Sequence, residues 1–152
     1  LNPSFSDVKW YGNGPHEIYI DRKQASNIGI YHSNTEDLFT MYARPQDNGN
    51  RTEIRWVEFS SNKNVTLKFC SSVPFNFSAS HYKKEDLDSG RNKKASQKHV
   101  RLLEPREDIY VNIDGFTSGV GCVNSWGALP RKEYRLPYGS YNYSYWMVPT
   151  LE

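Results

Sequence analysis

The stretch Asn64-Val65-Thr66-Leu67-Lys68-Phe69-Cys70 alternates apolar and polar side chains along most of its length. Successive side chains of a β-strand point to opposite faces of the sheet, so this period of two predicts a half-buried antiparallel strand. The same alternation returns in residues 108–114 and in the tyrosine-rich residues 141–148. Three such segments indicate a sheet protein rather than a helical one.

Shorter segments rich in β-forming side chains predict further strands at residues 8–10, 27–32, 38–42, 52–59 and 133–136. The string Pro137-Tyr138-Gly139-Ser140 is typical of a turn, and it predicts a final hairpin between its two flanking segments. Only residues 82–88 favour a helix, with Gly90 placed to end it. The chain is therefore predicted to be a single all-β domain over residues 1–152, built as an antiparallel β-sandwich.

The composition restricts the classes of partner. Aromatic residues make up 14% of the 152 residues, and 11 of them are tyrosines, which favours a sheet with amphipathic surfaces. The net charge is only +2 and no apolar run reaches membrane length, so nothing indicates a nucleic-acid or membrane partner. The basic residues 89–99 contain no interleaved aromatic side chain, which favours a solvated loop over a stacking surface for nucleic acid.

Cysteine and histidine give no sign of a metal centre. The 4 histidines do not pair with each other or with a cysteine at metal-ligand spacing, so no metal site is predicted in this chain. Cys70 and Cys122 are too few for a disulfide framework. One bridge between them stays open, and two free thiols are the favoured interpretation.

Two turn-rich segments stand apart from the strands. Gly14-Pro15-His16-Glu17 favours a tight turn, in which we expect His16 and Glu17 to anchor the backbone by hydrogen bonds. Arg44-Pro45-Gln46-Asp47-Asn48-Gly49 is similar, and Arg44 is expected to clamp backbone carbonyls or a carboxylate. We interpret both segments as architecture in preference to direct substrate binding.

A third segment is rich in glycine and ends on a tryptophan. Residues 112–116 read as a strand that runs into Gly119-Val120-Gly121 and then Asn124-Ser125-Trp126-Gly127. A large ring on such a loop is suited to binding, because loops lie on the surface and carry function more often than packing. The alternative is that Trp126 fills the core, as Trp10, Trp56 and Trp146 are expected to do from their apparent strands.

Taken together and in this order, these three segments resemble the C-terminal domain of bacterial β-galactosidases of glycoside hydrolase family two. The resemblance extends from about Val8 to about Tyr145 and depends on several rare local strings. It implies that the sandwich is part of a larger supersandwich similar to galactose mutarotase. It also implies that both catalytic glutamates lie in a central β/α barrel upstream, which is absent from this chain.

The resemblance also assigns a role to Trp126. In the family, the tryptophan of the Asn/Asp-Ser-Trp string reaches the active site, where its indole packs on the apolar face of galactose. Asn124, Ser125 and Gly121 would then support the loop. This chain departs from the family at Gly121-Cys122, because Cys122 stands where the family commonly has a second glycine.

No catalytic residue is predicted here, because none of the many acids stands in a motif typical of a glycosidase acid or nucleophile. The predicted function is a non-catalytic domain that completes the active site of a β-galactosidase. Stand-alone carbohydrate binding and a structural sandwich for subunit contacts are the alternatives.

By resemblance, the parent enzyme uses magnesium, with sodium as a further candidate, and lies in the bacterial cytoplasm or periplasm. The expected partners are a β-galactoside, the barrel and other domains of the same polypeptide, and a second copy of the protein.

Overall fold

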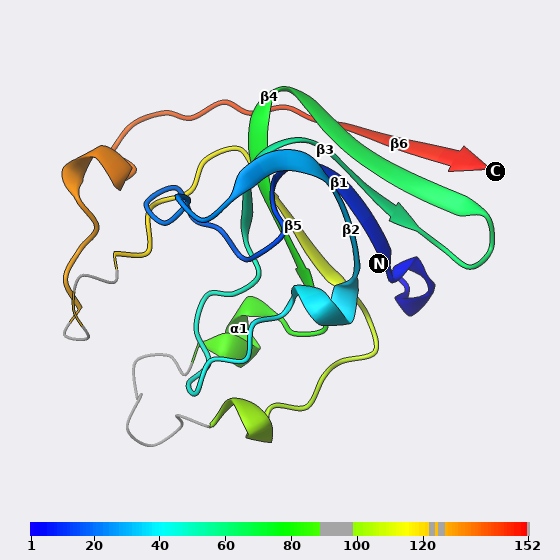
Figure 1. Ribbon diagram of the computed structural model, residues 1–152, viewed down its shortest axis with the longest axis horizontal. Coiled ribbons are helices and arrows are strands. Elements are labelled where there is room, and N and C mark those ends of the chain that lie inside the picture. The colour runs from blue at the N-terminus through cyan, green and yellow to red at the C-terminus, as the bar shows by residue number, and fades with distance from the viewer. Residues whose placement is uncertain (89–98, 122–123, 125–126, 152) are drawn as a thin grey trace.

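The computed structural model describes residues 1–88, 99–121, 124 and 127–151. These residues form one antiparallel sheet of 6 strands, shown in Figure 1. The strands are β1 (Asp7–Gly14), β2 (Asn27–Asn34), β3 (Arg51–Ser60), β4 (Val65–Ser80), β5 (Tyr110–Asp114) and β6 (Trp146–Leu151). The fold is all-β, as predicted, and the sheet is consistent with one layer of a sandwich.

The strand order is β2-β1-β3-β4-β5, and β6 pairs with β4 outside this path. The 16-residue strand β4 makes this possible, because its first half pairs with β6 and its second half with β5. In Figure 1, β6 (red) runs beside β4 (green). The register between β3 and β4 shifts between Ile54 and Trp56, where residues 71–74 of β4 form a bulge. Such a bulge bends a strand and increases its twist.

One face of the sheet holds the core. Val8 lies opposite Phe59 and Trp10 lies opposite Val57, so alternate residues of β1 and β3 place their apolar side chains on the same face. Phe59 makes edge-to-face contacts with Phe69 and Phe77 at ring-centroid distances of 6.0 and 6.3 Å. This geometry is the one that aromatic pairs prefer. The buried apolar cluster comprises Val8, Trp10, Leu38, Ile54, Val57, Phe59, Phe69, Phe75, Phe77, Ala79 and Ile109.

The opposite face carries a row of apolar side chains that remain accessible. Ile30, Tyr11, Trp56, Cys70 and Trp146 are register partners on five successive strands. Ile30 is 63% exposed and Trp146 57% exposed, whereas core residues on the other face are almost fully buried. We call this set the outer row. The expectation that Trp56 and Trp146 fill the core, as Trp10 does, was therefore wrong.

Helices are few and short among the described residues. The α-helix α1 (Lys84–Leu87) lies within the predicted residues 82–88, so this prediction is confirmed, while Gly90 lies outside the described residues. The Asp86 carboxylate caps the helix by accepting a hydrogen bond from Lys83 N at 2.9 Å. The remaining helices are 3₁₀ turns: η1 (Pro3–Phe5), η2 (Thr35–Leu38), η3 (Val100–Leu102) and η4 (Lys132–Tyr134). None of the described helices has the length and apolar character needed to cross a bilayer.

The strand predicted at residues 38–42 was wrong. Leu38 ends the 3₁₀ helix η2, and the chain beyond it bonds to a side chain instead of a neighbouring strand. Thr40 N donates to Asn48 Oδ1 at 2.8 Å, and Asn48 Nδ2 donates to Thr40 O at 2.6 Å. An asparagine amide that satisfies both backbone groups removes the need for a sheet partner.

The predicted final hairpin was also wrong. Part of the predicted strand at residues 133–136 is the 3₁₀ helix η4, whose Tyr134 O accepts a hydrogen bond from Gly119 N at 2.7 Å. The last strand begins only at Trp146, and its partner is β4, which lies far from it in sequence. The alternation of residues 141–145 continues outside the sheet. Residues 71–80 of β4 were missed because Ser71 and Ser72 interrupt the apolar positions and Pro74 is atypical of a strand interior.

Removal of one ring from the core tests this arrangement. Phe77 and Val73 both lie on β4, but Phe77 is 0% exposed and Val73 is 55% exposed. We expect Phe77→Ala to lower the free energy of unfolding by about 3 to 5 kcal/mol, since a large cavity forms. Val73→Ala should change it by less than about 0.5 kcal/mol. Urea denaturation followed by circular dichroism measures both, and equal effects of the two substitutions would contradict the assignment of the core face.

Candidate functional site

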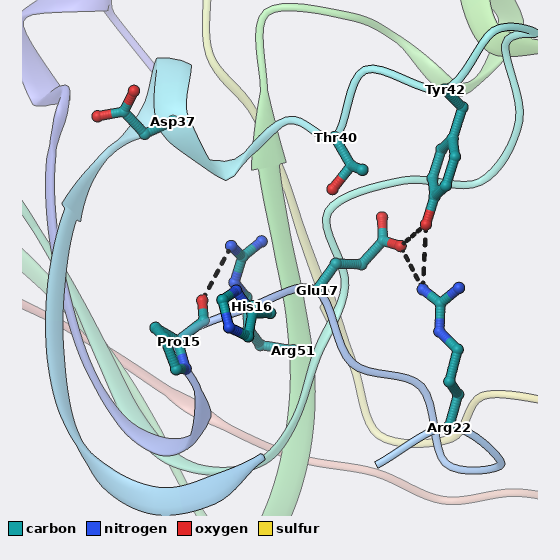
Figure 2. A pocket seen from close by; sticks show the side chains of 8 residues that line it. All are labelled: Pro15, His16, Glu17, Arg22, Asp37, Thr40, Tyr42 and Arg51. Carbon is teal, nitrogen blue, oxygen red and sulfur yellow. Dashed lines mark hydrogen bonds and ion pairs between the residues drawn. The ribbon is translucent and has the colours of Figure 1, made fainter. Parts of the chain in front are cut away.

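The carboxylate of Glu17 is the centre of a polar cluster beside the sheet. Glu17 is 8% exposed. Its Oε2 accepts a hydrogen bond from Gly49 N at 2.6 Å, and its Oε1 accepts from Arg22 Nη2 at 2.5 Å and from the Tyr42 hydroxyl. Figure 2 shows the Arg22 and Tyr42 groups converging on this oxygen. A buried carboxylate needs such donors, because burial without them is costly.

Arg22 and Tyr42 also contact each other, at 3.1 Å between Arg22 Nη2 and the Tyr42 hydroxyl. Burial and the hydrogen bond to Glu17 raise the pKa of Tyr42 above its ordinary value. Tyr42 therefore stays protonated at neutral pH and keeps donating to the carboxylate. The Arg22 guanidinium lies over the ring of Tyr19, 5.2 Å from its centroid, which restricts the arginine further.

Arg51 is a second buried charge next to Glu17. It is 4% exposed, and its Nη1 donates to Leu38 O at 3.0 Å and to Gly49 O at 2.7 Å. The guanidinium also lies 5.5 Å from the ring centroid of Trp10. Burial lowers the pKa of Arg51 to about 10, and the charge of Glu17 opposes this shift. Arg51 therefore remains protonated at pH 7, and it connects the carbonyl oxygen of Leu38 with that of Gly49 in its own segment.

Glu17, Arg22, Tyr42 and Arg51 border a cavity of about 380 Å³, which Figure 2 shows from close by. Its other lining residues are Pro15, His16, Asp37 and Thr40. The lining is polar, whereas a typical small-molecule pocket is mostly apolar with few polar groups. Both oxygens of Glu17 are occupied by donors, so this carboxylate is arranged to hold the loops together rather than to transfer a proton.

A second acidic side chain holds the glycine-rich segment. Asp21 lies in the turn from Tyr19 to Arg22, which is closed by a hydrogen bond from Arg22 N to Tyr19 O at 2.9 Å. Its Oδ1 accepts from Val120 N at 3.1 Å and its Oδ2 accepts from Gly121 N at 2.8 Å. The turn from Tyr19 to Arg22 is therefore in direct contact with the glycine-rich segment, although the two lie about 100 residues apart in the sequence.

The predicted site residues fall into three groups. Trp126 and Ser125 lie outside the described residues, as does Cys122, so their predicted roles stay predictions. Gly121 is held by Asp21, and Asn124 is exposed, with its Oδ1 accepting a long hydrogen bond of 3.4 Å from Ala128 N.

Of the turn residues, Glu17 makes the contacts described above. His16 is exposed at the rim of the cavity, and the described part of the chain provides no hydrogen-bond partner for it. Arg44 is exposed in the loop that leads to Gly49.

Sequence reasoning did not assign roles to Asp21, Arg22, Tyr42 and Arg51. A signal was nevertheless present, because a buried acid such as Glu17 requires cationic or hydroxyl partners, and Asp21-Arg22 follows it closely. The partners could not be chosen from the sequence, since Tyr42 and Gly49 reach Glu17 only through the fold. Within the described ranges, no three His, Cys, Asp or Glu side chains gather as a metal cluster would require.

Comparison with known proteins identifies the family to which the sequence is similar. The family described as "Beta galactosidase small chain" matches residues 1–147. Three similar curated proteins are each named beta-galactosidase. The protein of Oenococcus oeni is 31% identical over 145 residues, which are 95% of this chain and 13% of the relative. That of Pseudoalteromonas haloplanktis is 36% identical over 141 residues, which are 93% of this chain and 12% of the relative.

A third relative, from Lactococcus lactis subsp. lactis, is 34% identical over 137 residues, which are 90% of this chain and 13% of the relative. The chain thus spans about one eighth of the length of the curated relatives that it matches. The similarity extends over nearly all of this sequence, including the Glu17 cluster, the Asp21 turn and the glycine-rich segment. The chain therefore belongs to the β-galactosidase small-chain family.

Proposed function

We propose that this chain completes the active site of a β-galactosidase without providing its catalytic carboxyl groups. The parent enzyme hydrolyses terminal β-D-galactose residues, and this domain contributes apolar surface for the sugar through Trp126. The observation that carries the proposal is family membership over residues 1–147, combined with the small share of each relative that the chain covers. The catalytic groups then belong to the rest of the polypeptide.

The acids of the described structure support this division. Hydrolysis of a glycosidic bond usually requires two carboxyl groups, about 5 to 10 Å apart, that flank the bond. Glu17 is bound by three donors, and Asp21 by two backbone amides. Asp86 forms a bidentate pair with Arg106, whose hydrogen bonds lower the pKa of the carboxyl to about 2. The oxygens of these carboxylates are engaged by hydrogen-bond donors in structural contacts, which does not suit a general acid.

The proposed role of Trp126 follows from the segment that leads to it. Gly119 and Gly121 are attached to the body of the domain by Asp21 and by Tyr134 O, so the segment starts from a fixed base. An indole presented from a fixed base provides area and orientation for the C–H bonds of galactose, while polar groups elsewhere provide specificity. The tryptophan thus contributes to binding and not to bond cleavage.

A structural role is the second candidate, and the outer row favours it. Tyr11 and Trp56 pack with ring centroids 6.4 Å apart on the accessible face, beside exposed Ile30 and Trp146. An accessible apolar row of this length is typical of a surface that another layer covers. In that function the domain would support the parent enzyme by packing, and substitutions at Trp126 would leave sugar binding unchanged.

The first test concerns activity. The purified chain should hydrolyse no chromogenic β-galactoside, because the proposal assigns the catalytic carboxyl groups to the rest of the polypeptide. The full-length polypeptide prepared from the same host is the positive control. Turnover by the chain alone, in a preparation shown to be free of host enzyme, would contradict the proposal.

The second test concerns Trp126. In the full-length enzyme, Trp126→Ala should weaken galactose binding by about 1 to 3 kcal/mol, the range for losing one good apolar contact. The unfolding free energy of the domain should barely change, since no core is emptied. Tyr138→Ala is a matched control, because Tyr138 is a fully exposed aromatic residue. A large loss of stability with intact galactose binding would instead identify Trp126 as a core residue.

The third test separates the Glu17 cluster from sugar binding. Glu17→Gln keeps the shape of the side chain but removes the charge that Arg22 and Tyr42 contact. We expect the unfolding free energy to fall by about 1 to 3 kcal/mol, less than for a fully buried ion pair because the Arg22 side chain is 45% exposed. Glu58→Gln, which breaks a pair with Lys68 on the accessible face, should cost less than about 1 kcal/mol.

Below the unfolding transition, galactose affinity of the Glu17→Gln enzyme should change less than that of the Trp126→Ala enzyme. The comparison uses thermal denaturation for stability and inhibition by galactose for affinity. If Glu17→Gln abolishes turnover while stability stays unchanged, Glu17 acts in the chemistry and its structural assignment is wrong.

A further inference from the structure

We propose that Asp21 is the positioning residue of the glycine-rich loop, and that it holds this loop in the placement that sugar binding requires. The proposal rests on the proposed function and deepens it, because it names the group that fixes the base of the segment leading to Trp126. Asp21 itself need not touch the sugar. It acts through the backbone amides of Val120 and Gly121.

The contacts are those of a carboxylate seated on consecutive amides. Each oxygen of Asp21 accepts one hydrogen bond, at 3.1 Å from Val120 N and at 2.8 Å from Gly121 N. The partners lie 99 and 100 residues from Asp21 in the sequence, so the pair fixes two distant parts of the chain. Successive backbone N–H groups form a concave site for an anion, and hydrogen bonds to a charged acceptor are stronger than neutral ones.

The glycines on either side of Val120 fit this contact. A Cβ atom at position 119 would lie 2.5 Å from Asp21 Oδ2, so a side chain there would displace the carboxylate. Gly121 has a φ of +79°, a conformation that residues with a side chain rarely adopt. A Cβ there would also lie 2.9 Å from Ala128 O. The Gly119-Val120-Gly121 pattern is therefore explained by the close approach of Asp21 and of the returning chain.

The turn that presents Asp21 is itself anchored. Its next residue, Arg22, binds the buried carboxylate of Glu17 at 2.5 Å. In Figure 1, this turn (blue) lies beside the segment that contains Val120 (yellow), in agreement with their hydrogen bond. A continuous series of contacts thus leads from the Glu17 cluster through Arg22 and Asp21 to the base of the loop.

A merely structural role for Asp21 makes a different prediction. If the two hydrogen bonds only stabilise the domain, their loss lowers the unfolding free energy and has no particular effect on galactose. If Asp21 positions the loop, its effect on galactose depends on the presence of the Trp126 indole. A double-mutant cycle distinguishes these cases, because residues that act through each other are not additive.

The experiment uses the full-length enzyme with Asp21→Ala, Trp126→Ala and both together. We expect Asp21→Ala to weaken inhibition by galactose about tenfold, since displacement of a binding group by about 1 Å has effects of this order or larger. In the enzyme that already carries Trp126→Ala, Asp21→Ala should weaken inhibition by galactose by less than about a further twofold. Hydrogen exchange should accelerate in the peptide that contains Val120 and Gly121. Asp21→Asn keeps one acceptor oxygen and should give an intermediate effect on both measurements.

Asp86→Ala is the matched control, because Asp86 also accepts a backbone N–H but lies on α1, outside this series of contacts. It should leave galactose inhibition and exchange at Val120 unchanged. Two results would overturn the positioning role. One is a double variant whose loss of galactose inhibition equals the product of the two single losses. The other is unchanged hydrogen exchange at Val120 and Gly121 in Asp21→Ala. Unchanged galactose inhibition in Trp126→Ala would overturn the proposed function instead, so the two failures are distinguishable. If Asp21→Ala does not fold, Asp21→Asn carries the same cycle.

Discussion

The buried carboxylate of Glu17 is the constraint on which the arrangement of the loops depends. A negative charge at this depth requires donors on both oxygens, and the chain provides them from the Asp21-Arg22 turn, from Tyr42 and from the backbone of Gly49. The donors come from the Tyr19–Arg22 turn and from two positions in the loop between η2 and β3, so satisfying one charge places both loops. The core of the sheet explains why the domain folds, and Glu17 explains where its loops lie.

Arg51 and Asp21 extend this constraint in two directions. Arg51 binds the carbonyls of Leu38 and Gly49, which fixes the segment between η2 and β3. Asp21 binds the amides of Val120 and Gly121 and so fixes the base of the glycine-rich loop. A charged side chain inside an apolar core would be costly. At the edge of the core, Arg51 and Asp21 instead supply hydrogen-bond partners for backbone groups that have no partner in a neighbouring strand. Under the proposed function, the contacts of Asp21 with Val120 and Gly121 would fix the base of the loop beside the active site.

The sequence predicted the strands whose alternation is continuous, and it failed where side chains take over backbone hydrogen bonding. Residues 65–70 became part of β4, where Leu67 and Phe69 pair with Phe59 and Val57 of β3. Residues 38–42 did not form a strand, because the Asn48 side chain makes the hydrogen bonds to the backbone of Thr40 that a neighbouring strand would otherwise make. The pairing of β6 with β4 depends on contacts between distant segments, which periodicity cannot report. For the site, the turn-rich strings located Glu17 and Gly121, but the partners Tyr42 and Val120 required the fold.

The most direct test of this account is a structure of the full-length polypeptide with galactose bound. We expect the apolar face of the sugar to lie against the Trp126 indole, with both oxygens of Asp21 still on the amides of Val120 and Gly121. We also expect the two carboxyl groups that flank the anomeric carbon to come from outside these 152 residues. A carboxylate of this chain within hydrogen-bond distance of the glycosidic oxygen, or a sugar without contact to Trp126, would contradict the account.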